Sequence, residues 1–102
     1  MDAPRGDVLV KEKTETRHPP LYRVILHNDD YTPMDFVVWL LENVFHHTHD
    51  EAHHLTMTIH HQGAATAGIF SYDVARTKMH QVLEHAKKEM HPLQCSIEPT
   101  EG

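Results

Sequence analysis

The sequence predicts an α+β fold, a two-layer sandwich in which a three-stranded sheet is covered on one face by three helices. Three observations support this. Apolar residues recur with strand or helix spacing in the order strand, helix, helix, strand, helix, strand. The helices and the last strand each have one apolar face, which needs a second layer to bury it. At 102 residues, the chain can bury one hydrophobic core but not two.

The first strand and the first helix lie between residues 22 and 45. Tyr22–His27 is rich in aromatic and β-branched residues, which favour a strand, and the Asx-rich residues 28–31 favour a turn. Thr32 is expected to cap the helix, with Pro33 at its first position and Asp35 completing a capping box. An apolar stripe then runs to about Phe45, through Phe36, Val37, Leu40, Leu41 and Val44.

The second helix is predicted to start at a capping box formed by Thr48 and Glu51 and to end at Gly63, a residue suited to a left-handed C-cap. Its apolar stripe consists of Ala52, Leu55, Thr56 and Ile59. Residues 64–70 are predicted to form the second strand, although small side chains weaken the pattern.

The third helix is predicted to start at Ser71 and to be stopped by Pro92. Its inward stripe consists of Ala75, Met79, Val82, Leu83, Ala86 and Met90. Residues 93–97 alternate between apolar and polar and predict a last strand. A right-handed crossover would make the second and third strands parallel, and the first strand would then lie between them, antiparallel to both.

Composition and charge narrow the class of protein. Residues 1–19 are expected to form a flexible N-terminal extension and residues 20–102 the folded domain. A net charge of −6 argues against a nucleic-acid partner, although twelve histidines limit that argument to neutral and higher pH. The sequence shows no secretory signal or membrane span, and its one cysteine fits a reducing compartment. We therefore expect a cytoplasmic protein, and a monomer.

Two polar features could bind a ligand. Asn28, Asp29 and Asp30 stand just before a helix; they could simply form a turn, or they could offer acceptor oxygens to a cation. His60 borders the apolar stripe of the second helix, where it could be an ordinary half-buried side chain or could accept a hydrogen bond from a ligand amine.

The histidine-rich segment 46–61 raises the alternative of a metal-binding protein. His49 and His53 have the i, i+4 spacing of metal ligands on a helix. A closed zinc site needs four ligands, however, and the chain has one cysteine and no HExxH motif, so we predict no resident metal or other cofactor. No pattern predicts covalent catalysis, because Cys95 is expected to face the core and no serine lies in a nucleophile elbow. We predict that the protein is not an enzyme.

Four stretches of the sequence carry a family resemblance: Asn28–Val37 (NDDYTPMDFV), His60–Gly63 (HHQG), Thr77-Lys78 and His91–Cys95 (HPLQC). Together they resemble ClpS, the adaptor of the Clp AAA+ protease, over about residues 20–98. The resemblance implies the small α/β domain that also forms the C-terminal domain of the ribosomal stalk protein. It also implies a protein that binds substrates through a destabilising N-terminal residue (Phe, Tyr, Trp or Leu) and delivers them to the ClpA unfoldase of ClpAP.

The resemblance also implies roles for particular residues. Asn28, Asp29 and His60 would engage the α-amino group and the first peptide unit of the ligand, and Asp30 and Thr32 would shape the rim. The side-chain pocket would be lined by Leu26, Met34, Val37, Thr56, Ile59 and Leu93. Met34 would exclude β-branched side chains by steric conflict. Asp73 and Lys78 lie where the family docks on the N-domain of the unfoldase; without the resemblance, they read as an ordinary solvated helix face.

One position departs from the family pattern. The family usually has methionine four residues before the HxQG histidine, and here that residue is Thr56. Met57 points about 100° away around the helix and cannot replace it. A roomier pocket is expected, with an altered ranking among Leu, Phe, Tyr and Trp. The sequence is compatible with two other interpretations: a histidine-rich metal-binding protein, and a plain interaction domain without a ligand pocket.

Overall fold

A computed structural model describes residues 19–101, and its element order is the predicted one. Strand β2 (Leu21–His27) is followed by helices α3 (Met34–Asn43) and α4 (His49–Gln62), then by β3 (Ala64–Ser71), α5 (Tyr72–Lys88) and β4 (Gln94–Pro99). The predicted extension at residues 1–19 lies outside the described residues except for Pro19. Among the described residues, no helix is long and apolar enough to cross a membrane.

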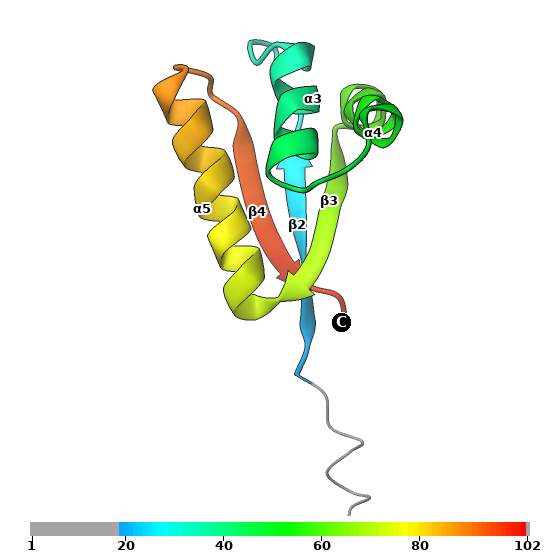
Figure 1. The fold of residues 1–102 in the computed structure, drawn as a ribbon, viewed down its shortest axis with the longest axis vertical. Coiled ribbons are helices and arrows are strands. Elements are labelled where there is room, and N and C mark those ends of the chain that lie inside the picture. Colours follow the sequence, from blue (N-terminus) through cyan, green and yellow to red (C-terminus); the bar gives the residue numbers. More distant parts are fainter. Residues whose placement is uncertain (1–18, 102) are drawn as a thin grey trace, which may run out of the picture.

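The sheet has the order β3-β2-β4, with β2 antiparallel to both neighbours, which confirms the predicted arrangement. Leu26 of β2 lies opposite Ala65 on one side and Cys95 on the other. All three helices cover one face of the sheet (Figure 1). The two-layer α+β sandwich is therefore confirmed.

The core lies between this sheet face and the helices. Val24 and Leu26 of β2 are fully buried, and residues of all three helices pack on them: Val37, Leu40, Leu41, Ala52, Ile59, Ala75, Val82 and Ala86. Cys95 and Ile97 lie opposite Leu26 and Val24 and pack against this core from β4, as their alternation predicted. Leu93, just before β4, is also buried.

Helix α4 starts and ends as predicted. The Thr48 hydroxyl accepts a hydrogen bond from the Glu51 N–H at 3.2 Å, and Glu51 Oε1 accepts one from the Thr48 N–H at 2.9 Å. These two bonds form the predicted capping box. Gly63 caps the other end with a φ of 93°, a left-handed conformation that glycine adopts without steric cost.

The predicted capping box at the start of α3 is wrong. The helix begins at Met34 with Pro33 as its N-cap, and no side chain caps it. Thr32 instead donates its hydroxyl hydrogen to Asp29, three residues upstream. The helix also ends slightly earlier than expected, at Asn43, although the Phe45 N–H still bonds to the Leu40 carbonyl at 3.3 Å.

The end of α5 also corrects a prediction, because Met90 does not belong to the inward stripe. The helix ends at Lys88, and Met90 has a φ of 62° and is 88% exposed. The His91 N–H bonds back to the Ala86 carbonyl at 2.8 Å, which is the pattern of a Schellman motif around a left-handed residue. The helix therefore stops by its own backbone hydrogen bonds before Pro92 is reached.

Candidate functional site

The turn after β2 is built around the carboxylate of Asp29. Its Oδ1 accepts hydrogen bonds from the backbone N–H groups of Tyr31 and Thr32, both at 2.8 Å. Its Oδ2 accepts the Thr32 hydroxyl at 2.7 Å. Three bonds leave this carboxylate at least one unused lone pair. The turn is thus fixed in shape and still holds an acceptor for a ligand.

The charge of Asp29 is stabilised by these contacts. Partial burial alone would raise the pKa of its carboxyl group, but the hydrogen bonds from Thr32 and Tyr31 and the nearby His91 together lower it below its ordinary value. Asp29 is therefore ionised at neutral pH, as a group that binds an ammonium ion must be.

The last turn of α4 lies beside this Asp29 turn. The Asn28 N–H donates to the Gly63 carbonyl at 2.9 Å, which joins the end of β2 to the end of α4. His60 stands three residues before Gly63, on the same last turn, and is exposed. The carboxyl end of a helix carries partial negative charge, which favours a cation. The structure thus brings Asn28, Asp29 and the His60 turn to one end of the molecule, and their joint role in binding an α-amino group stays a prediction.

The residues expected to form the side-chain pocket divide into two groups. Met34 is 41% exposed at the start of α3. The other apolar members belong to the buried core behind it: Leu26, Val37, Ile59 and Leu93. Of the rim residues, Asp30 is exposed and Thr32 is partly buried. Their joint role as a pocket stays a prediction.

Thr56 has its hydroxyl satisfied inside its own helix. The residue is only 3% exposed, and its Oγ1 donates to the Ala52 carbonyl at 2.8 Å. The hydroxyl group therefore leaves no unpaired donor in the wall between α3 and α4. Thr56 therefore differs from a methionine at this position chiefly by its smaller side chain.

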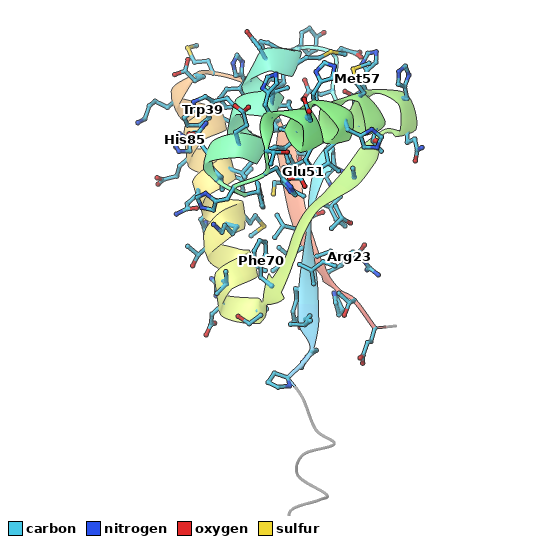
Figure 2. All side chains as sticks on the ribbon, turned by 45° about the vertical axis from the view of Figure 1, so that its right-hand side comes forward. Arg23, Trp39, Glu51, Met57, Phe70 and His85 are labelled. Atoms are coloured by element: carbon cyan, nitrogen blue, oxygen red, sulfur yellow. The ribbon has the colours of Figure 1, made fainter. Side chains whose placement is uncertain are left out.

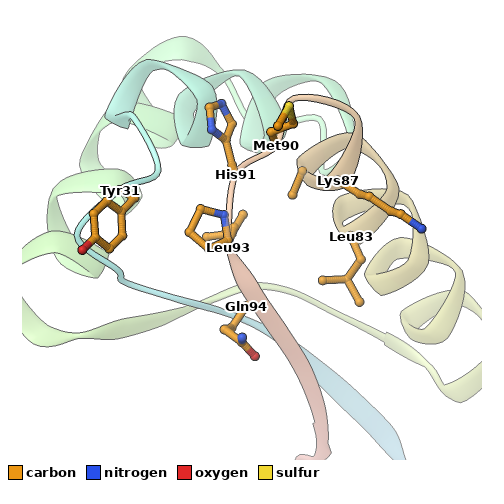
Figure 3. A pocket seen from close by; sticks show the side chains of 9 residues that line it. Tyr31, Leu83, Lys87, Met90, His91, Leu93 and Gln94 are labelled. Carbon is orange, nitrogen blue, oxygen red and sulfur yellow. The ribbon is translucent and has the colours of Figure 1, made fainter.

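Two hollows lie near this end of the molecule. One, of about 450 Å³, lies between α3 and α4 and includes Met34 and Thr56 in its lining. The other, of about 670 Å³, lies between Tyr31 and the end of α5 and includes Leu93 (Figure 3). Tyr31 and His91 also line this second hollow, and both lie in the motifs quoted above, although no periodic pattern marked them. His91 packs on Phe36 with ring centroids 4.6 Å apart.

The two residues expected to meet an unfoldase differ in their surroundings. Asp73 is exposed in the first turn of α5. Lys78 is partly buried: its Nζ donates to the Val44 carbonyl at 2.6 Å and lies 5.8 Å from the centroid of the Phe70 ring. Lys78 therefore binds the carboxyl end of α3, whatever else it contacts, and is not simply part of a solvated helix face.

Two histidines of the histidine-rich segment 46–61 are engaged in contacts between elements. His47 Nε2 lies 2.6 Å from the Ala67 carbonyl, and His49 Nδ1 lies 2.7 Å from Glu42 Oε2. Within residues 19–101, no three His, Cys, Asp or Glu side chains gather so that they could hold a metal ion. Cys95 is partly buried, and burial raises the pKa of its thiol to about 12. A thiol of this kind is a poor nucleophile at neutral pH.

Comparisons with known proteins point to one family. The family model described as ATP-dependent Clp protease adaptor protein ClpS matches residues 17–96. The chain is 51% identical to the ATP-dependent Clp protease adapter protein ClpS of Deinococcus radiodurans over 94 residues, which are 92% of this chain and 83% of that one. It is 46% identical to the protein of that name from Roseobacter denitrificans, with the same coverage of both chains.

A solved structure extends the agreement to three dimensions. The structure of Agrobacterium tumefaciens ClpS2 bound to L-phenylalaninamide is 38% identical to this chain and has a TM-score of 0.78, and the match covers 80% of this chain and 99% of that chain. The fold, the family model and the relatives concur: this chain belongs to the ClpS family, the adaptor proteins of the ATP-dependent Clp protease.

Proposed function

We propose that this chain binds proteins through a free N-terminal Phe, Tyr, Trp or Leu and delivers them to a ClpA-type unfoldase for degradation by ClpAP. The observation that carries the proposal is the ionised Asp29 carboxylate, which keeps an unused acceptor position and lies beside the last turn of α4. The L-phenylalaninamide bound to the Agrobacterium tumefaciens protein has an α-amino group next to an aromatic side chain and supports the same chemistry.

The proposed binding uses two kinds of contact. An α-ammonium group offers three donors and one charge, and Asp29, Asn28 and His60 offer acceptors to it. Each charge-assisted hydrogen bond supplies about 1.5–3 kcal/mol, and burying a Leu or Phe side chain supplies about 2–3 kcal/mol. After the cost of association, these contacts are sufficient for micromolar or tighter binding. The role needs no covalent step by this chain, and we propose that it is a non-catalytic, cytoplasmic protein.

A peptide that begins with Phe, titrated in free and N-acetylated form, tests the proposal. We expect the free peptide to bind and the acetylated peptide to bind at least about tenfold more weakly, since acetylation removes the charge and the donors. Asn28→Ala combined with His60→Ala should weaken binding of the free peptide. Equal binding of the two peptides, or a double variant that binds as well as the parent, would favour the plain interaction domain. Tight zinc binding without peptide binding would favour the metal-binding protein.

Specificity for the first residue is proposed to depend on Thr56. Its small volume adjoins the hollow between α3 and α4, and its hydroxyl is already paired. A methionine there would fill part of this space, so Thr56→Met should reduce the affinity for an N-terminal Trp peptide relative to a Leu peptide. An unchanged ratio of the two affinities would refute this role of Thr56.

We propose that Asp73 and Lys78 contact the N-domain of the unfoldase. Asp73 carries the test, because the Lys78 ammonium group is already bonded to the Val44 carbonyl. Asp73→Lys should weaken binding to a ClpA-type N-domain, while Glu84→Lys on the same helix provides a matched change of charge at another exposed position. Equal effects of the two substitutions would show that only the net charge matters. Peptide binding should be unchanged in both variants.

A further inference from the structure

Two contacts between a histidine and an aromatic ring join the α5 end of the molecule to α3. Trp39 of α3 and His85 of α5 have ring centroids 4.9 Å apart and lie side by side in Figure 2. Phe36 of α3 and His91, in the connection after α5, have ring centroids 4.6 Å apart. Phe36 and Trp39 lie three residues apart on one face of α3, with their rings stacked. The two contacts are therefore alike in kind but lie at different points along α3.

The contact made by His91 adjoins the Asp29 turn. Phe36 is in the first turn of α3, and its N–H donates to the Pro33 carbonyl at 3.1 Å. Pro33 directly follows Thr32, which is bonded to Asp29. The ring of His91 therefore packs on the segment by which the Asp29 turn passes into the helix. The other contact lies about one turn farther along α3.

His91 also lies close to the Asp29 turn itself. It lines the same hollow as Tyr31, whose N–H donates to Asp29 Oδ1 at 2.8 Å (Figure 3). Partial burial raises the pKa of the Asp29 carboxyl group, and hydrogen bonds from Thr32 and Tyr31 lower it; the charge of His91 lowers it further. His91 thus acts on this turn both through its ring contact with α3 and through its charge.

The backbone before His91 brings its ring to this position. Met90 has a φ of 62°, a left-handed conformation that is unfavourable for a residue with a side chain. Its own side chain is 88% exposed, so the conformation is not explained by packing of that side chain. The Met90 N–H donates to the Lys87 carbonyl at 3.0 Å, and the His91 N–H to the Ala86 carbonyl at 2.8 Å. The chain therefore leaves the axis of α5 at Met90, and His91 is held where its ring contacts α3.

We propose that His91 is a positioning residue of the ligand site: its ring, packed on Phe36, keeps the Asp29 turn in the shape that receives the α-ammonium group of the ligand. This inference rests on the proposed function. A turn that is already ordered costs less to bind than one that must be ordered by the ligand. Loss of the ring contact should therefore reduce the affinity for ligands with a free amine and leave other ligands unaffected.

Alanine variants at the two contacts provide the test. Peptides that begin with a free or an N-acetylated Phe would be titrated at pH 7.5 into the parent, His91→Ala and His85→Ala. We expect His91→Ala to weaken binding of the free peptide about 3- to 10-fold, the equivalent of one aromatic pair, and to leave binding of the acetylated peptide unchanged. His85→Ala is the matched control, because His85 is also half-buried and makes the same kind of contact. It should leave the affinity for both peptides unchanged.

Hydrogen exchange tests the same role without a ligand. The N–H groups of Tyr31 and Thr32 are bonded to Asp29, so their exchange rates report the opening of the turn. Both should exchange about 3- to 10-fold faster in His91→Ala than in the parent, and at the rate of the parent in His85→Ala. His91→Phe keeps a ring on Phe36 and should retain the exchange rates and the peptide affinity of the parent.

The outcomes separate this inference from the proposed function. A parent that does not distinguish the two peptides would overturn the proposed function, whereas unchanged exchange of Tyr31 and Thr32 in His91→Ala would overturn the role of His91. Equal losses in His85→Ala and His91→Ala would overturn it too, because helix packing in general would then be the cause. So would a His91→Phe variant that behaves like His91→Ala. Urea denaturation checks that the variants are folded, and His91→Gln takes the place of His91→Ala if that variant is not.

Discussion

Helices α3 and α4 begin with similar sequences, Thr-Pro-Met-Asp and Thr-His-Asp-Glu, but only α4 begins with a capping box. At α4, Thr48 and Glu51 satisfy each other's backbone N–H groups. At α3, Thr32 is bonded to Asp29, which lies outside the helix. The Asp29 carboxylate therefore binds the threonine hydroxyl that would otherwise cap α3, and Thr32 shapes the turn instead. The same threonine-containing start sequence thus stabilises a helix at α4 and shapes the candidate binding site at α3.

The largest effect on peptide affinity is expected for a substitution of Asp29, the residue that distinguishes the start of α3 from that of α4. Asp29→Asn removes the negative charge and should weaken binding of a peptide with a free N-terminal Phe by about 10- to 100-fold, the equivalent of one charge-assisted hydrogen bond. Fluorescence anisotropy with a labelled peptide measures it. Asp50→Asn, at the exposed start of α4, is the matched control and should leave the affinity unchanged. Equal losses in the two variants would contradict the assignment of Asp29.

Replacing Thr32 and Thr48 by alanine, one at a time, should have different effects on stability and on peptide affinity. Thr48→Ala removes a true N-cap and should lower the free energy of unfolding by about 1 kcal/mol without affecting peptide affinity. Thr32→Ala frees Asp29 from one hydrogen bond, so the main loss should be in affinity, by several-fold. Urea denaturation and peptide titration on both variants give the four values. If Thr32→Ala impaired only stability and Thr48→Ala only affinity, the comparison would be wrong.

The carboxyl ends of the two helices differ as well, and Lys78 tests this difference. Helix α4 ends at Gly63, whereas α3 ends beneath the ammonium group of Lys78 from α5. Lys78→Met should lower the free energy of unfolding by about 1–2 kcal/mol, because a buried carbonyl loses a charged donor. Lys88→Met, at the exposed end of α5, should change it by less than about 0.5 kcal/mol. A stability loss no larger than that of Lys88→Met would show that the contact with Val44 contributes little.

The smallest expected effect is on the acid limb of the stability curve. The pKa values of Asp29 and Glu51 are both lower in the folded chain than their ordinary values of 3.8 and 4.5. Their contribution is therefore complete above these values and is lost as the pH falls through the lower folded pKa. Urea denaturation at pH 6, 4 and 3 should show that the free energy of unfolding falls less with decreasing pH in Asp29→Asn than in the parent. Glu51→Gln should likewise show a smaller fall than the parent. Parallel curves for all three proteins would refute this coupling.

The fold could be predicted from the sequence because its signals are local and agree with one another. Two layers were predicted from the apolar stripes of α3, α4 and α5 and from the alternation of β4. The handedness rule for crossovers then predicted that β2 lies in the centre of the sheet. The errors came at helix ends, where hydrogen bonds between residues three to five positions apart override the periodic pattern. Met90 continues the helical period, but hydrogen bonds to the carbonyls of Ala86 and Lys87 end the helix before it.

The candidate site was less predictable than the fold. The resemblance pointed to Asn28, Asp29 and His60, but the bond from the Asn28 N–H to the Gly63 carbonyl, which brings them together, joins residues 35 positions apart. The contact between Lys78 and Val44 spans 34 positions and has no periodic signature either. Side-chain contacts of this kind depend on how two elements pack, which the pattern of one element does not record.

The raised pKa of Cys95 has a practical consequence for all of these experiments. Because burial raises the pKa of this thiol to about 12, its thiolate is scarce at neutral pH, and alkylating reagents react with it slowly. A second cysteine introduced at the exposed position of Met90 could be coupled to a fluorophore while the native sulfur stays unmodified. The parent background thus already serves as an unreactive starting point for site-directed labelling.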